Sequence, residues 1–374
     1  MDRFWNPVHT IVGDGAAAET ANVLRQMGAQ GKNVLLLVWN NALLEREGFA
    51  GLLANQDFKV TPYCFQASNP TVGQLFETYR QTRELRPAAV VAVGGGSILD
   101  VGKSLCCLYG ADISSEEELR AAIREKTLPS PAARWIGIPT TAGTGSEVTC
   151  WATIWDPDKN AKLSVESKEN YAYAALVDPS LAAGMPVSLA VSSGLDAVAH
   201  AVESYWAKAS NTVSKGLALR AVDIIMKDMD RLTDGCPDAH LSMAQGSMLA
   251  GMAFSNTKTT ACHSISYPLT MRYNIPHGAA VSMLLAPVMS LNAPMIEDLP
   301  ALLRALGLDS LDEVGPRVRE LLKKAGLPSS LREWGIKEED LPELAGLGMT
   351  KGRADNNPHE LNEQIILEIL RSIY

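Results

Sequence analysis

Short apolar runs alternate with longer amphipathic stretches through the first half of the chain, and this alternation constrains the fold more than any other feature. Continuous apolar runs such as NVLLLV (33–38) and AAVVAV (88–93) are typical of strands buried on both faces of a sheet. Strands that alternate with helices predict a parallel, doubly wound sheet. We expect strands over 8–13, 33–38, 59–65, 88–93, 135–139 and 174–179, helices over 16–28, 42–56 and 72–85, and a hairpin over 150–165 that turns at DPDKN.

The second half carries only helical periodicity. From about Pro186 onward the apolar residues recur at helical spacing, and the last part of the chain has short amphipathic segments divided by Gly and Pro. A chain of 374 residues is long enough for two domains. We therefore predict an α/β domain over 1–184 and an all-helical domain over 185–374, with helices over 187–206, 211–232, 239–254 and 279–292.

Bulk composition excludes several classes of protein. The formal net charge of −9 argues against a nucleic-acid binder or a membrane-surface protein, because both usually present a basic face. The first residues lack the apolar segment of a signal peptide, and no apolar run is long enough for a transmembrane helix. None of the six cysteines forms a CxxC pair, so we expect reduced thiols in a cytoplasmic protein.

Four side chains of the second half have the composition of a metal site. Asp196 and His200 lie four residues apart in SSGLDAVAHAVESYW and share one helix face. His263 opens ACHSISYPL, and His277 lies in the loop-like segment IPHGAA. One carboxylate and three imidazoles suit Zn, Fe(II) or Ni rather than Mg or Ca, and such a cation polarises an oxygen. The remaining histidines, and Cys262 beside His263, are interpreted as structural.

Two glycine-rich turns follow predicted strands. In VVAVGGGSILDVGKS (90–104) the amides at a helix start near Ser97 favour an anion such as a dinucleotide pyrophosphate. This turn is neither GxGxxG nor a Walker A loop. The segment IPTTAGTGSEVT (138–149) offers hydroxyls to a phosphate, a ribose or a nicotinamide carboxamide. The two turns, with the metal residues, predict a ligand crevice between the domains.

Taken together, GGGSILDVGKS, PTTAGTGSEVT, the Asp196 and His200 spacing, and PHG at 276–278 resemble the iron-containing (group III) alcohol dehydrogenase family. The resemblance covers essentially the whole chain. It implies a Rossmann-like domain and a helical domain of the dehydroquinate synthase-like type, with NAD or NADP, Fe(II) or Zn, and a homodimer or larger homo-oligomer. It implies Asp196, His200, His263 and His277 as metal ligands. It assigns the cofactor to Gly94, Gly95, Gly96, Ser97, Asp100, Thr140, Thr141, Thr144 and Ser146.

The chain departs from the family pattern at three places. Many members carry a second His four residues after the third ligand, and here that residue is Tyr267, so we expect Tyr267 and His277 to take part in catalysis by a different proton route. The second strand ends at Asn40 without the usual carboxylate, and an Asn there need not repel a 2′-phosphate, so NADP fits beside NAD. A Gly-rich stretch before the third ligand is replaced by NTKTTAC (256–262).

The segment NTKTTACHSISYPLTMRYNIPHG (256–278) looks most like the phosphonoacetaldehyde reductase branch of this family. This resemblance implies reduction of phosphonoacetaldehyde, or of its sulfonate analogue sulfoacetaldehyde, with Lys258 and Arg272 as groups for the anionic head. A broad alcohol or aldehyde dehydrogenase acting on small neutral substrates is the main alternative. A lyase of the dehydroquinate synthase type and a non-catalytic scaffold are further alternatives.

Overall fold

The structure is a computed structural model that describes residues 2–159 and 161–374. The chain divides into two compact units. The α/β unit comprises Asn6–Thr141 and Ser146–Leu181. The helical unit comprises Ala182–Tyr374, a short N-terminal stretch that ends at Trp5, and the loop Ala142–Gly145. The sequence boundary near residue 184 lies close to this division.

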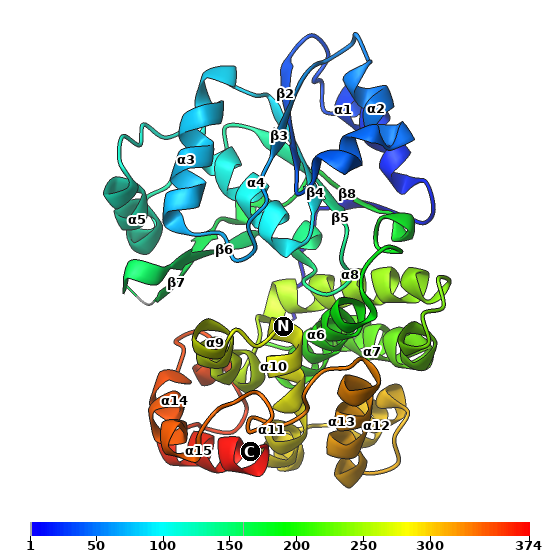
Figure 1. The fold of residues 1–374 in the computed structure, drawn as a ribbon, viewed down its shortest axis with the longest axis vertical. Coiled ribbons are helices and arrows are strands. Elements are labelled where there is room, and N and C mark those ends of the chain that lie inside the picture. The colour runs from blue at the N-terminus through cyan, green and yellow to red at the C-terminus, as the bar shows by residue number, and fades with distance from the viewer. Residues whose placement is uncertain (1, 160) are drawn as a thin grey trace. The chain divides into compact units, whose positions relative to one another are not determined.

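A six-stranded parallel sheet forms the centre of the α/β unit (Figure 1). The strand order is β1-β8-β5-β4-β2-β3. Strands β2 and β3 therefore extend the sheet toward one edge, and β4, β5 and β8 extend it toward the other. Every strand of the sheet was predicted from the sequence, as was the parallel arrangement. The strands are β1 His9–Val12, β2 Asn33–Val38, β3 Lys59–Cys64, β4 Ala89–Gly94, β5 Arg134–Pro139 and β8 Ala174–Val177.

The helices of the α/β unit differ from the sequence prediction at two places. The expected helix over 42–56 is broken, because Arg46 is extended (φ −66°, ψ 141°) between a short 3₁₀ turn and α2. The helix α5 was not predicted, although Ser115 caps it by accepting from the Glu118 amide and three Glu residues fill its first turn. The helices are α1 Thr20–Gln26, α2 Glu47–Leu53, α3 Val72–Thr82, α4 Gly96–Leu108 and α5 Glu116–Glu125.

The predicted hairpin is present as the antiparallel pair β6 Trp151–Asp156 and β7 Ala161–Glu166. Its register pairs Trp151 with Glu166 and Asp156 with Ala161. Residue 160 of the predicted DPDKN turn lies outside the described residues. This small sheet is separate from the six-stranded sheet.

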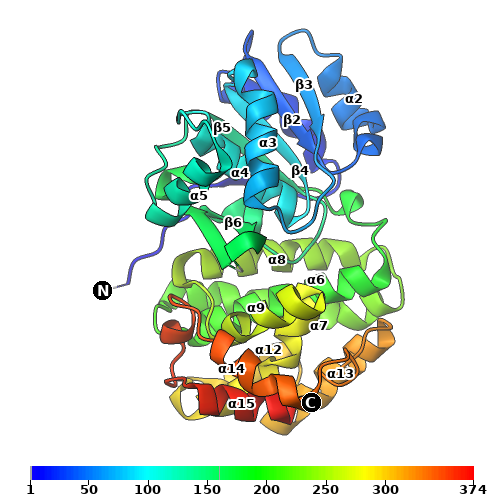
Figure 2. The same ribbon diagram turned by 60° about the vertical axis from the view of Figure 1, so that its left-hand side comes forward.

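The helical unit contains no strand among its described residues, as predicted (Figure 2). Two predictions need correction. His277 is not in a loop but is the first residue of α10, and the expected helix over 279–292 is interrupted at Leu284. The helices are α6 Val187–Trp206, α7 Thr212–Thr233, α8 Ala239–Thr257, α9 Ala261–Tyr273, α10 His277–Met283, α11 Leu285–Asn292, α12 Leu299–Leu306, α13 Val314–Lys324, α14 Leu341–Leu347 and α15 Glu363–Ser372.

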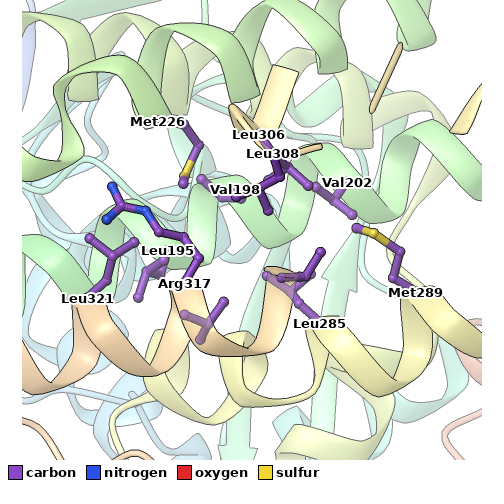
Figure 3. A pocket seen from close by; sticks show the side chains of 12 residues that line it. Leu195, Val198, Val202, Met226, Leu285, Met289, Leu306, Leu308, Arg317 and Leu321 are labelled. Atoms are coloured by element: carbon purple, nitrogen blue, oxygen red, sulfur yellow. The ribbon is translucent and has the colours of Figure 1, made fainter. Parts of the chain in front are cut away.

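Helix α6 is the central element of the helical unit, because it is buried on nearly all sides from Ala190 to Trp206. One of its faces borders a small apolar cavity, where Leu195, Val198 and Val202 meet side chains of α7, α11 and α13 (Figure 3). The guanidinium of Arg317, whose stem also lines the cavity, pairs with Asp230 of α7 at 2.7 Å. The cavity therefore lacks the convergent polar groups of a ligand site.

All six cysteines are free thiols. Among the described residues no single helix has the length and apolar character to cross a membrane, and only the bent pair His277–Met283 and Leu285–Met295 meets that criterion when taken together.

Candidate active site

Three of the four predicted metal ligands converge in the helical unit. Ligand atoms of Asp196, His263 and His277 all lie within 4.8 Å of one another. Oδ1 of Asp196 is 3.5 Å from Nε2 of His263 and 4.0 Å from Nε2 of His277. These side chains come from α6, α9 and α10 respectively, so residues far apart in sequence meet at one point.

The buried polar atoms at this point fit a divalent cation. Asp196 Oδ1 and His263 Nε2 are buried, and neither has a hydrogen-bond partner among the described residues. Burying such atoms without partners is costly, and a cation held between them would satisfy both. A carboxylate oxygen with imidazole nitrogens is a donor set for Fe(II) or Zn, as the sequence predicted.

His200, the fourth predicted ligand, lies against this cluster without belonging to the group of three. Its ring stacks on His263 with centroids 4.4 Å apart and on Phe254 at 4.2 Å. Its Nδ1 lies 3.2 Å from the carbonyl oxygen of Gly143 and 3.9 Å from Asp196 Oδ1. Donation from Nδ1 to Gly143 leaves Nε2 with the lone pair that a metal requires. Its ligation of the metal stays a prediction.

Glu203 is a buried carboxylate beside the metal cluster that the sequence reasoning did not identify. It is fully buried, and it accepts hydrogen bonds from His263 Nδ1, from the Thr260 hydroxyl and from the Cys262 amide. The bond from His263 fixes the Nδ1–H tautomer and turns Nε2 toward Asp196. The signal was present, because Glu203 follows Asp196 by seven residues and His200 by three and thus shares their helix face.

The charges of this cluster are strongly coupled. Burial raises the pKa of Asp196, but the neighbouring histidines, His200 first, hold it below its ordinary value. Burial lowers the pKa of His200 to about 4. Burial also acts to lower the pKa of His263, but the carboxylates of Glu203 and Asp196 raise it to about 9. Without a metal, the proton on His263 therefore supplies the positive charge that the two carboxylates require.

Small residues allow the elements of this site to approach closely. A Cβ on Gly278 would lie 1.9 Å from the Ser192 carbonyl oxygen, so α10 meets α6 backbone to backbone one residue after His277. A Cβ on Gly143 would lie 2.8 Å from the Ser193 carbonyl oxygen, which brings the Gly143 carbonyl to His200. Bulkier residues at these glycines would push the histidines away from Asp196.

Tyr267 lies face to face with His277. The ring centroids are 6.0 Å apart and the rings are nearly parallel, at 11°. Tyr267 is buried, one turn after His263 on α9, which places a phenol at the edge of the metal cluster. The arrangement is compatible with the predicted role of Tyr267 and His277 in proton transfer, which stays a prediction.

The two predicted anion-binding cations occupy different surroundings. Lys258 ends α8, just before α9 begins at Ala261, and is half-buried. Arg272 lies nine residues after His263, and its side chain therefore points from the opposite face of α9. It pairs with Glu343 of α14 at 2.7 Å. The assignment of Arg272 to the substrate stays a prediction, and of the two cations only Lys258 lies near the start of α9.

The glycine turn of the α/β unit has the predicted strand–turn–helix form. Strand β4 ends at Gly94 and α4 begins at Gly96. A Cβ on Gly94 would lie 2.4 Å from the Ile98 side chain, so only glycine fits there. The helix start leaves backbone amides available for an anion, as expected for a pyrophosphate.

Asp100 and Ser146, both predicted to bind cofactor, bond to each other. The Ser146 hydroxyl donates to Asp100 Oδ1 at 2.6 Å, and Oδ2 accepts from the Thr153 amide at 2.8 Å. Fully buried Lys103, which the sequence reasoning missed, donates to Ser146 at 3.0 Å and to the Trp151 carbonyl at 2.7 Å. This network joins the two glycine-rich turns within the α/β unit, and Asp100 therefore has a structural role whatever it binds.

The remaining predicted cofactor residues lie at ends of elements. Asn40 uses its side chain to cap a 3₁₀ turn by accepting from the Ala42 amide at 2.9 Å. The Ser97 hydroxyl accepts from the Asn69 amide at 3.1 Å. The Thr140 amide donates to Gly94, and the Thr141 side chain approaches Gly95. Thr144 belongs to the loop that joins the helical unit. The assignment of these residues to the cofactor stays a prediction.

Comparison with known proteins identifies the family. The description "Iron-containing alcohol dehydrogenase" matches residues 7–179, and "Fe-containing alcohol dehydrogenase family, C-terminal" matches residues 190–374. A 1,3-propanediol dehydrogenase from Klebsiella pneumoniae is 32% identical over 76% of each chain. A lactaldehyde reductase from Escherichia coli K12 is 31% identical over 82% of each chain.

A structural comparison agrees. The crystal structure of a sulfoacetaldehyde reductase from Bifidobacterium kashiwanohense in complex with NAD+ has a TM-score of 0.88 at 26% identity, and the match covers 100% of this chain and 98% of that one. The family uses NAD(P) and iron, and the convergence of Asp196, His263 and His277 provides a place for the metal. The chain belongs to the iron-containing alcohol dehydrogenase family and is an NAD(P)-dependent, metal-dependent oxidoreductase.

Proposed function

We propose that this enzyme reduces a two-carbon aldehyde with a tetrahedral anionic head group. The substrate is phosphonoacetaldehyde, which gives 2-hydroxyethylphosphonate, or its sulfonate analogue sulfoacetaldehyde, which gives isethionate. In either case the carbonyl carbon gains a hydride from NADH or NADPH, the carbonyl oxygen gains a proton, and the nicotinamide is oxidised.

The backbone of Lys258 carries this proposal. Lys258 has φ 60° and ψ 179°. Other non-glycine residues with positive φ at helix ends, Arg86, Lys126 and Asn274, have ψ of 58°, 40° and 28° and lie in the ordinary left-handed region. Lys258 instead lies in a region that is essentially restricted to glycine, where a side chain costs about 1–3 kcal/mol. A lysine at a position with this cost indicates a role for its ammonium group.

The position of Lys258 supports an anionic ligand. The helix α9 begins three residues later, so Lys258 lies in the turn that leads into it. His263, in the first turn of the same helix, faces Asp196. A head group held at the start of α9 and a carbonyl held near His263 would therefore belong to one short molecule. The name of the Bifidobacterium structure is consistent with such a substrate.

The chain's own residues supply positioning and proton transfer. A divalent cation between Asp196, His263 and His277 would polarise the carbonyl of the aldehyde. Glu203 holds the His263 ring, and Gly143 holds the His200 ring. The phenol of Tyr267, stacked on His277, is the group that we assign to proton delivery.

A second candidate is the reduction of small neutral aldehydes. Two relatives above 30% identity are named as a 1,3-propanediol dehydrogenase and a lactaldehyde reductase, whose names indicate uncharged substrates. Lys258 would then have no anionic partner in the substrate, and its strained backbone would have no use in catalysis. We therefore favour the anionic substrate.

Steady-state kinetics with the Fe(II)-loaded enzyme tests the proposal. Phosphonoacetaldehyde, sulfoacetaldehyde, propanal and lactaldehyde are each assayed with NADH and with NADPH. We expect kcat/KM for one anionic aldehyde to exceed that for propanal by about 100-fold or more, as expected for a charge-assisted contact of about 3 kcal/mol.

The variant Lys258→Met tests the assigned group. The ratio of kcat/KM for the anionic aldehyde to that for propanal should fall by about tenfold or more, chiefly through KM. Lys337→Met is a matched control, because Lys337 is an exposed lysine of the helical unit that pairs with Glu339. An unchanged ratio in Lys258→Met, or a wild-type enzyme that prefers neutral aldehydes, would contradict the proposal.

A further inference from the structure

The turn at Lys258 is held by a side chain from the C-terminal part of the chain. Nδ2 of Asn356 donates to the carbonyl oxygen of Thr257 at 2.8 Å and to that of Thr259 at 3.0 Å. An amide nitrogen has two hydrogens, so these two bonds use the whole donor capacity of the group. The first carbonyl belongs to the peptide group that precedes Lys258 and the second to the residue that follows Lys258, so the two bonds bridge the turn 257–259.

This contact acts on the backbone angles of Lys258 itself. Because one nitrogen atom bonds to the carbonyl of the residue before Lys258 and to that of the residue after it, the backbone angles of Lys258 and Thr259 are restrained together. The Thr257 hydroxyl adds a third bond, to the carbonyl oxygen of Lys258 at 2.9 Å. Backbone conformations of this kind persist only where surrounding contacts over-determine them.

Asn356 is itself anchored to the end of α6. Its backbone oxygen accepts from the Lys208 amide at 3.0 Å, and Nζ of Lys208 donates to the Asp355 carbonyl at 3.0 Å. Helix α6 carries Asp196 and Glu203, and Glu203 binds the first turn of α9 through Thr260 and Cys262. The turn at Lys258 is therefore fixed to the same helix that carries the metal residues.

We propose that Asn356 is a positioning residue that determines substrate specificity, because it holds the backbone turn that presents Lys258 to the anionic head group. The inference rests on the proposed function of Lys258. It predicts that loss of the Asn356 amide reduces the preference for an anionic aldehyde, although Asn356 touches neither the metal residues nor, on this proposal, the substrate.

The neighbouring residue shows how a merely structural asparagine differs. Asn357 is fully buried and exchanges amide bonds with Asn292, at 2.9 Å and 2.8 Å. Those bonds join the C-terminal segment to α11 and do not reach the carbonyls beside Lys258. Asn356 is the residue of this pair that acts on the turn.

A double-mutant cycle tests the inference in the intact, Fe(II)-loaded enzyme. Asn356→Leu, which keeps the shape of the side chain but removes both donors, is combined with Lys258→Met. Lys208→Met is the matched control, because it removes the bond to Asp355 but leaves both amide bonds of Asn356. For each variant we measure the ratio of kcat/KM for phosphonoacetaldehyde or sulfoacetaldehyde, whichever the wild type prefers, to that for propanal.

We expect Asn356→Leu to lower this ratio about tenfold, as for the loss of a net hydrogen bond, and to have no further effect on it in the Lys258→Met background. Lys208→Met should keep the wild-type ratio. An equal loss on both aldehydes would mean that Asn356 only supports the fold, and a loss of the ratio that persists in the Lys258→Met background would mean that it does not act through Lys258. Either result overturns the inference.

The failure of the proposed function would give a different result. If Lys258→Met alone leaves the ratio unchanged, the lysine is not the anion-binding group, and both proposals fall. If Lys258→Met lowers the ratio and Asn356→Leu does not, the proposed function stands and only the role of Asn356 is refuted.

Discussion

Replacing Lys258 with glycine should stabilise the protein and at the same time remove the cation that we assign to the substrate. The reason lies in the backbone, since φ 60° with ψ 179° is a conformation that glycine adopts without strain. A side chain there costs about 1–3 kcal/mol, whereas glycine loses about 1 kcal/mol more backbone entropy on folding than alanine. The net gain should be about 1 kcal/mol.

The comparison with alanine isolates the strain. Lys258→Gly and Lys258→Ala both lose the ammonium group and the aliphatic stem, and they differ only in the Cβ that the backbone conformation disfavours. We expect the glycine variant to be more stable than the alanine variant by about 1 kcal/mol. For a domain of about 200 residues this corresponds to a difference of about 2–4 °C in Tm.

Calorimetry of the metal-free protein measures this difference, because bound metal would add its own stabilisation to each variant. The control variants Lys337→Gly and Lys337→Ala should show the opposite order of stability, with alanine the more stable. Lys337 has φ −91° and ψ 150°, where alanine is unstrained and glycine only increases the entropy of the unfolded chain. If Lys258→Ala proves as stable as Lys258→Gly, the lysine is not strained, and the main argument for its function is lost.

Three further predictions concern the metal site and the two units. Glu203→Gln should weaken metal binding about 10–100-fold in a chelator competition assay. The NH2 group of a Gln amide would face at least one of the three groups that now donate to the carboxylate, which are the Thr260 hydroxyl, the Cys262 amide and His263 Nδ1. Unchanged metal affinity would exclude the positioning role of Glu203. Gly278→Ala should lower the stability of the protein by about 1–3 kcal/mol and lower its metal occupancy, because the new Cβ would overlap the Ser192 carbonyl. Gly216→Ala in α7 is the control and should be neutral or stabilising, because the space around Gly216 is open. Equal Tm values for the two variants would contradict the packing argument. Burial raises the pKa of Glu147 to about 7 from an ordinary 4.5. Between these two pH values the folded state keeps a proton that the unfolded state has lost, so the free energy of unfolding falls as the pH rises from 4.5 to 7. Glu147→Gln should therefore raise Tm more at pH 8 than at pH 4.5, and a pH-independent effect would refute the shift.

The strands and the metal residues were predictable because their signals are local. A short continuous apolar run such as 33–38 is typical of a strand buried on both faces. The spacing of Asp196 and His200 places them on one face of a helix whatever surrounds that helix. His263 and His277 were grouped with them by residue type, and the resemblance implied their roles as ligands, because nothing in their own segments shows that α9 and α10 bring them to α6.

The features that were missed depend on tertiary contacts. Glu203 and Lys103 are charged residues that sequence reasoning assigns to a surface by default, and each is fully buried only because several bonds converge on it. The break at Arg46 interrupts a segment with helical periodicity, and the start of α10 at His277 follows Pro276, which reads as a loop signal. The turn at Lys258 receives hydrogen bonds from Asn356, almost a hundred residues later in the chain, so no local pattern indicates its conformation.

The arrangement around α6 separates the chemistry of this enzyme from its choice of substrate. One face of α6 carries Asp196, His200 and Glu203 at the metal cluster. The opposite face carries Leu195, Val198 and Val202, which border the apolar cavity of the helical unit (Figure 3). The turn at Lys258 is held instead by Asn356 and Thr257, whose bonds to it involve no metal residue. On the proposed function, we therefore expect substitutions at Lys258 and Asn356 to change the preference between aldehydes more than the affinity for the metal.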